Sequence, residues 1–209
     1  MSRLLLRRLS TAQRGRALLG EAEEALSRVQ LDLCVDRAEE GLWAVSAGSA
    51  SSCLSERRAL KNVLGIALHL EGNYEAAGAE LQAALQLAEE TGRRGATHDA
   101  FVDLAGCLGD LAANHVALGE LDAAKMRVKR GLYMCTNAYR PSACALGCLL
   151  STRGLLEEAN DNPQAAVSPE RNSNSLPTAP RCPAYSNPAP WPRGTRTPPL
   201  AIPRNSGLF

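Results

Sequence analysis

Aromatic side chains are scarce in this sequence, which has two Phe, two Trp and four Tyr among 209 residues. Hydrophobic residues still make up 45% of the chain, and they are mainly Ala and Leu. This composition favours a thin core of helices and argues against a β-sandwich. No stretch approaches the roughly 18 consecutive apolar residues of a membrane-spanning helix. We therefore expect a soluble, helical protein without a membrane span.

Motifs of catalytic chemistry are also lacking. The sequence has no phosphate-binding loop and no recognisable pairing of a nucleophile with a base. The seven cysteines are odd in number, and only Cys144 and Cys148 form a short-spaced couple, whereas structural zinc usually needs two couples. His115 lies on a predicted apolar stripe, where a lone histidine is usually a satisfied core residue. We therefore predict no enzyme, no cofactor and no metal site.

Residues 60–90 show the clearest pattern in the chain. Hydrophobic residues recur three and four positions apart in two blocks, as in the apolar stripe of an amphipathic helix. The residues between the blocks, 71–73, favour a tight turn around Gly72. The pattern predicts two antiparallel helices that cover each other's stripes, with Gly65 facing Ala77. The two stripes are Leu60, Val63, Leu64, Ala67 and Leu68, then Ala77, Leu81, Ala84, Leu85 and Ala88.

This block resembles the tetratricopeptide repeat, a helix-turn-helix unit of about 34 residues. The residues that carry the resemblance are Leu64, Gly65, Leu68, Tyr74, Ala77, Leu81 and Ala84. Copies of the pattern lie 43 residues earlier and 47 residues later, and the start of a fourth lies 89 residues later. Because these spacings are long, the chain resembles the variety with units of about 42 residues. Further positions of the repeat core are Leu111, Ala112, Leu121, Ala124, Val128, Gly154 and Ala166.

The resemblance implies an all-α fold, in which antiparallel helix pairs stack into a solenoid with a right-handed superhelical twist. We assign the repeat domain to residues 14–167, with units at 14–46, 57–90 and 99–136 and an incomplete unit at 142–167. The turn position of Gly72 is occupied by Gly119 in the third unit and by Val29 in the first. Residues 168–209 contain ten prolines and one acidic residue, a composition that predicts a disordered tail.

The fourth unit matches the repeat only in its first part. Ser168 and Pro169 interrupt the helical pattern shortly after the predicted turn, which suggests a truncated last repeat. The first helix of this unit is therefore predicted to lack its cover, leaving Leu149, Leu150 and Leu156 exposed. We expect such an apolar patch to support self-association or to bind a helix of a partner.

The resemblance also implies where a partner binds, because the groove of such repeats is lined mainly by the first helix of each pair. The Lys and Asn residues with which one subgroup of the family holds the C-terminal carboxylate of chaperones are absent. We expect a peptide or helix of another protein as the ligand. Carried over by position, the groove residues are Leu19, Glu23, Leu26, Asn62, Ile66, His69, Leu70, Asp110, Ala113, Val116, Ser151 and Leu155.

Charge is distributed unevenly along the chain. Residues 1–20 have five Arg and no acid, residues 21–167 have a net charge of −8, and residues 168–209 have +4. The acidic centre argues against nucleic acid and favours a basic partner. Residues 1–13 have the composition of a mitochondrial presequence or, alternatively, form the basic start of the first helix. We predict a non-catalytic protein-interaction scaffold in the cytoplasm, with a mitochondrial assembly factor built on the same repeats as the alternative.

Overall fold

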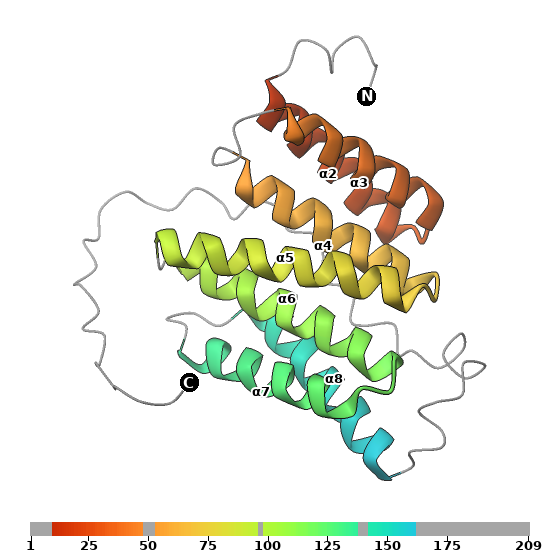
Figure 1. The fold of residues 1–209 in the computed structure, drawn as a ribbon, viewed down its shortest axis with the longest axis vertical. Helices are drawn as coiled ribbons and strands as arrows, with labels where there is room; N and C mark the ends of the chain where they lie inside the picture. Colours follow the sequence, from red (N-terminus) through yellow and green to blue (C-terminus); the bar gives the residue numbers. More distant parts are fainter. Residues whose placement is uncertain (1–9, 48–52, 96–97, 138–141, 162–209) are drawn as a thin grey trace.

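The computed structural model describes residues 10–47, 53–95, 98–137 and 142–161, and within these ranges the chain forms seven helices and no strand (Figure 1). The predicted all-α fold is therefore confirmed for the described residues. The helices are α2 (Thr11–Ser27), α3 (Leu31–Ser46), α4 (Leu54–Leu70), α5 (Tyr74–Arg94), α6 (His98–Ala117), α7 (Leu121–Asn137) and α8 (Ala143–Asp161).

Each helix packs against its neighbours along the chain. The most extensive contacts lie within the pairs α2 with α3, α4 with α5 and α6 with α7. Successive pairs meet through α3 and α4 and through α5 and α6, and α7 packs on α8. The first helices of successive pairs also touch, since α2 contacts α4, α4 contacts α6, and α6 contacts α8. Figure 1 shows the pairs following one another in sequence order, from α2 and α3 at one end to α7 and α8 at the other.

The first helices of the first three units start one to three residues earlier than predicted. α2 begins at Thr11 because Ser10 and Gln13 form a capping box, in which Ser10 Oγ accepts a hydrogen bond from the Gln13 backbone N–H. The basic segment assigned to residues 1–13 therefore overlaps the first helix. α4 begins at Leu54 with Cys53 as its N-cap. The end of the fourth unit, at 162–167, and the predicted disordered tail, at 168–209, lie outside the described residues.

The three turns that connect the two helices of a pair share one backbone conformation. Val29, Gly72 and Gly119 all adopt positive φ angles, of 60°, 85° and 76°. In each turn the N–H of this residue bonds the carbonyl three residues earlier, and the next N–H bonds the carbonyl five residues earlier, at 2.8–3.0 Å. This is the Schellman motif, which satisfies the last carbonyls of a helix. The first pair therefore has the same turn geometry, although Val29 stands where the other two pairs have a glycine.

We expect Val29→Gly to stabilise the protein by about 1 kcal/mol. A left-handed conformation brings the Cβ of an L-residue close to a carbonyl oxygen, which costs about 1–2 kcal/mol and part of which glycine recovers. The valine side chain is exposed, so little packing is lost. Chemical denaturation measures the change, and the reverse substitution Gly119→Val, in the equivalent turn, should destabilise. Equal stability of Val29→Gly and the wild type would contradict the strain at this turn.

Small residues inside each pair receive a side chain from the partner helix. The sequence predicted that Gly65 faces Ala77. In the structure a Cβ added to Gly65 would lie 2.6 Å from Leu81 Cγ, so the nearest side chain is that of Leu81. The equivalent positions are Ala22 with Ala38 in the first pair and Ala112 with Val128 in the third, and each couple shares a buried cluster. The contact inside a pair therefore recurs.

A second contact recurs between pairs. A Cβ on Gly41 of α3 would lie 2.7 Å from Leu60 of α4, and a Cβ on Gly131 of α7 would lie 2.5 Å from Leu149 of α8. At the equivalent junction between α5 and α6, Ala84 and Cys107 lie in one buried cluster. Two junctions therefore combine a glycine with a leucine, and the middle one combines an alanine with the smaller cysteine.

Most predicted core residues are buried or nearly so, but Gly154 is exposed, with no atom within 4 Å of its Cβ position. Ala166 lies outside the described residues. α8 corresponds to α4 at an offset of 89 residues, and it buries the side that packs on the preceding pair. The opposite side, which α5 covers in α4, is exposed in α8 and carries the ion pair of Arg153 with Glu157, at 2.9 Å.

The predicted apolar patch on the fourth unit is wrong in part. Leu149 and Leu156 are buried against α6 and α7. Leu150 alone is exposed, at 50%. The two buried leucines belong to the side of α8 that faces the third pair, and the sequence pattern assigned them to the side that lacks a cover. Of the three leucines, only Leu150 is therefore available on the described surface for self-association through α8.

Candidate binding surface

The predicted groove residues lie on α2, α4, α6 and α8, which contact one another in that order. Several of the apolar ones are partly buried against the core, as Leu19, Leu26, Ile66 and Val116 show. Leu70 and Ser151 are exposed, whereas Ala113 and Leu155 are intermediate. Among the polar ones, Asn62 and Asp110 bond each other across the helices, and His69 bonds Asn114. The first-helix surface, as we call this set of twelve predicted positions, therefore has an apolar base, and three of its polar residues are held by hydrogen bonds between helices.

Asp110 on α6 joins three helices through its carboxyl group. Asn62 Nδ2 of α4 donates a hydrogen bond of 2.8 Å to Asp110 Oδ2. Cys148 Sγ of α8 lies 3.8 Å from Asp110 Oδ1 and donates to it. Burial raises the pKa of the Asp110 carboxyl, and the hydrogen bonds from Asn62 and Cys148 oppose this shift. Asn62 Oδ1 is buried and has no hydrogen-bond partner among the described residues.

Asp110→Asn is expected to stabilise the protein at pH 7 by about 1 kcal/mol. The substitution removes a buried charge, and the new amide oxygen can still accept the hydrogen bond from Asn62 Nδ2. Because the folded-state pKa of Asp110 is raised, its protonation stabilises the fold below the unfolded value, near 4, and this stability is lost as the pH rises. The advantage of the variant should therefore shrink as the pH falls from 7 towards 4. Urea denaturation between pH 7 and pH 4 tests this prediction. A difference in stability between Asp110→Asn and the wild type that grows as the pH falls would contradict it.

Asn114 on α6 is fully buried and links the second and third pairs. Its Nδ2 donates to the Tyr74 carbonyl at 2.9 Å, and its Oδ1 lies 3.0 Å from His69 Nδ1, so the histidine ring donates through this nitrogen. The His69 ring also meets the Tyr74 ring edge-on, with centroids 5.2 Å apart. His69 and Tyr74 are among the residues predicted from the sequence, whereas Asn114 is not. A polar residue between apolar neighbours on a helix was the available signal.

A second polar contact lies nearer the start of these helices. Arg58 of α4 forms an ion pair with Asp103 of α6 at 2.9 Å, and both side chains are mostly buried. Burial raises the pKa of Asp103 and of Glu23 on α2, and in both cases the positive charge of Arg58 opposes the shift. Glu23 was predicted to lie on this surface, whereas Arg58 and Asp103 were not. These three charges sit on three successive first helices.

Three buried or partly buried cysteines are poorly suited to nucleophilic chemistry. Burial raises the pKa of Cys34 to about 11 and the pKa values of Cys107 and Cys148 to about 12, so these thiols are protonated at neutral pH. His115 Nδ1 lies 2.6 Å from Glu120 Oε2 at the turn between α6 and α7. Among the described residues, no three His, Cys, Asp or Glu side chains gather as metal ligands.

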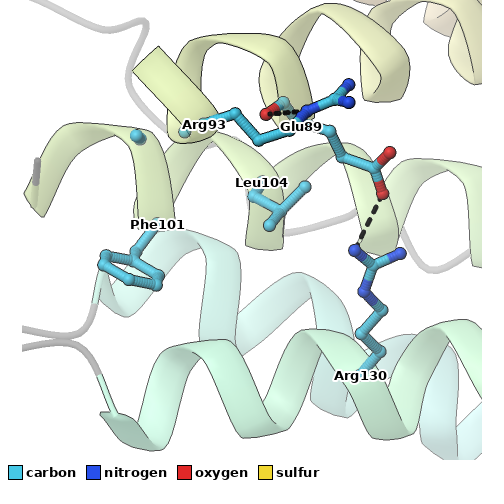
Figure 2. Close-up of a pocket in the computed structure, with 7 residues that line it drawn as sticks. Glu89, Arg93, Phe101, Leu104 and Arg130 are labelled. Carbon is cyan, nitrogen blue, oxygen red and sulfur yellow. Dashed lines mark hydrogen bonds and ion pairs between the residues drawn. The ribbon is translucent and has the colours of Figure 1, made fainter. Parts of the chain in front are cut away.

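A hollow of about 410 Å³ lies elsewhere, between the end of α5, the start of α6 and α7 (Figure 2). Figure 2 shows the ion pair of Arg130 with Glu89, at 2.8 Å, beside Phe101 and Leu104. Arg93 Nε donates a long bond of 3.4 Å to the Glu89 carbonyl. None of the predicted groove positions lines this hollow, whose residues are Glu89, Gly92, Arg93, Ala100, Phe101, Leu104 and Arg130.

The part of the chain that the structure describes contains no helix both long and apolar enough to cross a bilayer. Comparison with known proteins gives no further assignment, since no protein-family model, curated protein or solved structure matches the chain.

Proposed function

We propose that this chain is a non-catalytic interaction scaffold of the tetratricopeptide-repeat type, which binds a peptide or helix of a partner protein on the first-helix surface. The observation that carries the proposal is the shared turn of the three helix pairs, with positive φ at Val29, Gly72 and Gly119. The Schellman motif is common at helix ends, so the support comes from its recurrence at the equivalent position of all three pairs.

The recurring contacts support the same proposal. A small residue receives a side chain from the partner helix inside each pair, as Gly65 does from Leu81, and a second such contact lies at each junction between pairs. Units that bury their stripes only against their neighbours form solenoids, and solenoids present extended concave surfaces to partners. The right-handed superhelical twist is part of the proposal.

The chemistry of the surface favours a basic partner. Glu23, Asp103 and Asp110 lie on or beside it, with Arg58 as the cation between them. A cationic side chain of a ligand would offset the cost of keeping these partly buried carboxylates ionised. Exposed Leu70 and partly buried Leu155, on the first helices α4 and α8, offer apolar contacts.

Site-specific photo-crosslinking in cells tests the surface. A photoreactive residue at Leu70 or at Ser151 should trap the same partner, because both side chains are exposed on first helices. The photoreactive residue at Ala79 or Gln86, which are exposed on α5, should trap much less of this partner. Ser151→Lys should weaken capture through position 70 by repelling a basic ligand, and Ser151→Glu should not. Equal capture from α5, or none from either first-helix position, would contradict the proposal.

The alternative is a mitochondrial assembly factor that uses the same repeats. It is favoured by one observation, the five Arg and the absence of acid in residues 1–20. Imaging of the full chain with a C-terminal tag distinguishes the two proposals by the compartment in which the protein is found. Replacing Arg3, Arg7 and Arg8 by Gln should abolish a mitochondrial signal if these residues direct import.

A further inference from the structure

The second helices of the first and third pairs carry opposite charge. α3 has four acidic residues, Asp32, Asp36, Glu39 and Glu40, against one Arg, a net charge of −3. α7 has Lys125, Arg127, Lys129 and Arg130 against one Asp, a net charge of +3. All four acids of α3 and three of the four cations of α7 are exposed.

The charged residues occupy the same face of the two helices. Glu39, Glu40 and Trp43 of α3 correspond to Lys129, Arg130 and Tyr133 of α7, at an offset of 90 residues. We call these surfaces the α3 face (Asp32, Asp36, Glu39, Glu40, Trp43) and the α7 face (Lys125, Met126, Lys129, Arg130, Tyr133). Each face also exposes large apolar groups, with Trp43 at 71%, Met126 at 68% and Tyr133 at 64%.

Several of these charges have no ion pair among the described residues, namely Asp36, Glu39, Lys125 and Lys129. The two faces cannot meet within one molecule. α3 packs on α2 and α4, α7 packs on α6 and α8, and the helices between them separate the two ends (Figure 1). Among the described residues, neither face can therefore be the partner of the other.

We propose that a second copy of this chain docks here, with its α3 face on the α7 face of the first copy. The two faces are complementary in net charge, −3 against +3, and each brings an exposed aromatic ring to the contact. Opposite charges speed association and fix the register, while pairing α3 with α3 or α7 with α7 places like charges together. Aromatic residues are enriched in protein interfaces, and Trp and Tyr are common among the residues that contribute most to binding. This contact uses the second helices, so it is independent of the first-helix surface.

Analytical ultracentrifugation of the full chain tests the proposal with two charge-reversed variants. Asp36→Lys/Glu39→Lys makes both faces basic, and Lys125→Glu/Lys129→Glu makes both acidic. At roughly 100 μM protein and about 50 mM salt the wild type should associate, and each variant alone should bind itself at least about 10-fold more weakly. An equimolar mixture of the two variants should associate again, because each α3 face then meets an α7 face of opposite charge.

The matched control is Glu158→Lys/Asp161→Lys on α8, which changes the net charge by the same amount at two exposed positions. It should associate as the wild type does, and raising the salt to about 500 mM should weaken both. A wild type that stays monomeric at low salt overturns the proposal. So does a variant that self-associates like the wild type, or a mixture that fails to restore association. All substitutions are on exposed residues, and circular dichroism verifies that each variant is folded.

Discussion

Replacing Gly65 with alanine is expected to destabilise the protein by about 2 kcal/mol, because the new methyl group has no space. The added Cβ would lie 2.6 Å from Leu81 Cγ, 2.8 Å from Leu81 Cδ2 and 3.2 Å from the Leu81 backbone nitrogen. Leu81 is only 1% exposed, so its side chain cannot move away without disturbing the buried cluster around it. The overlap outweighs the higher helix propensity of alanine, which is worth about 1 kcal/mol.

Gly154 on α8 provides the matched control, since it occupies the equivalent position at an offset of 89 residues. Nothing lies within 4 Å of its Cβ position, so Gly154→Ala should stabilise by about 0.5–1 kcal/mol through helix propensity alone. Thermal or chemical denaturation of the two variants gives both values. A stabilising change at Gly65, like that expected at Gly154, would show that the close contact between α4 and α5 is absent.

Asn114→Ala is expected to destabilise by about 2–3 kcal/mol. The substitution removes both hydrogen bonds of a side chain that is 0% exposed, those to the Tyr74 carbonyl and to His69 Nδ1. It also leaves a cavity at the junction of α4, α5 and α6, where neighbouring side chains are fixed by packing. The loss includes a partly buried imidazole donor without an acceptor.

Asn160→Ala on α8 is the control for the chemistry of the substitution. Asn160 is exposed, and a surface change of this kind is usually worth less than about 0.5 kcal/mol. Equilibrium unfolding in urea should separate the two variants clearly. If Asn114→Ala were as mild as Asn160→Ala, the second and third pairs would not be joined through this side chain.

The sequence was sufficient to predict the helix pairs because their signals are local. Apolar residues at helical spacing mark the stripes, and Gly72 and Gly119 mark two of the turns, where the structure has positive φ. The first turn was harder, because valine is unfavourable at positive φ and nothing at position 29 indicates it. Only the recurrence at 43 residues places this residue in the turn.

The candidate site could be predicted less well, because position on a helix face does not determine the partner of a side chain. Asn62 and Asp110 were assigned to an open groove, but they lie on facing helices and bond each other at 2.8 Å. The roles of Asn114 and Arg58 in connecting helices could not be predicted, because they depend on contacts with residues 45 positions away in the chain. On α8 the two sides of the helix could not be told apart by pattern alone, which led to the wrong placement of Leu149 and Leu156.

The central claim, that the three helix pairs are equivalent units, is tested most directly by a double-mutant cycle at the middle junction. Ala84 and Cys107 there take the places of Gly41 with Leu60 and of Gly131 with Leu149. Cys107→Leu alone should destabilise by about 1–3 kcal/mol through overpacking. In the double variant Ala84→Gly/Cys107→Leu, which recreates the combination of the other junctions, at least about 1 kcal/mol of this loss should be recovered as a favourable coupling. Purely additive effects of the two substitutions would contradict the equivalence of the three junctions.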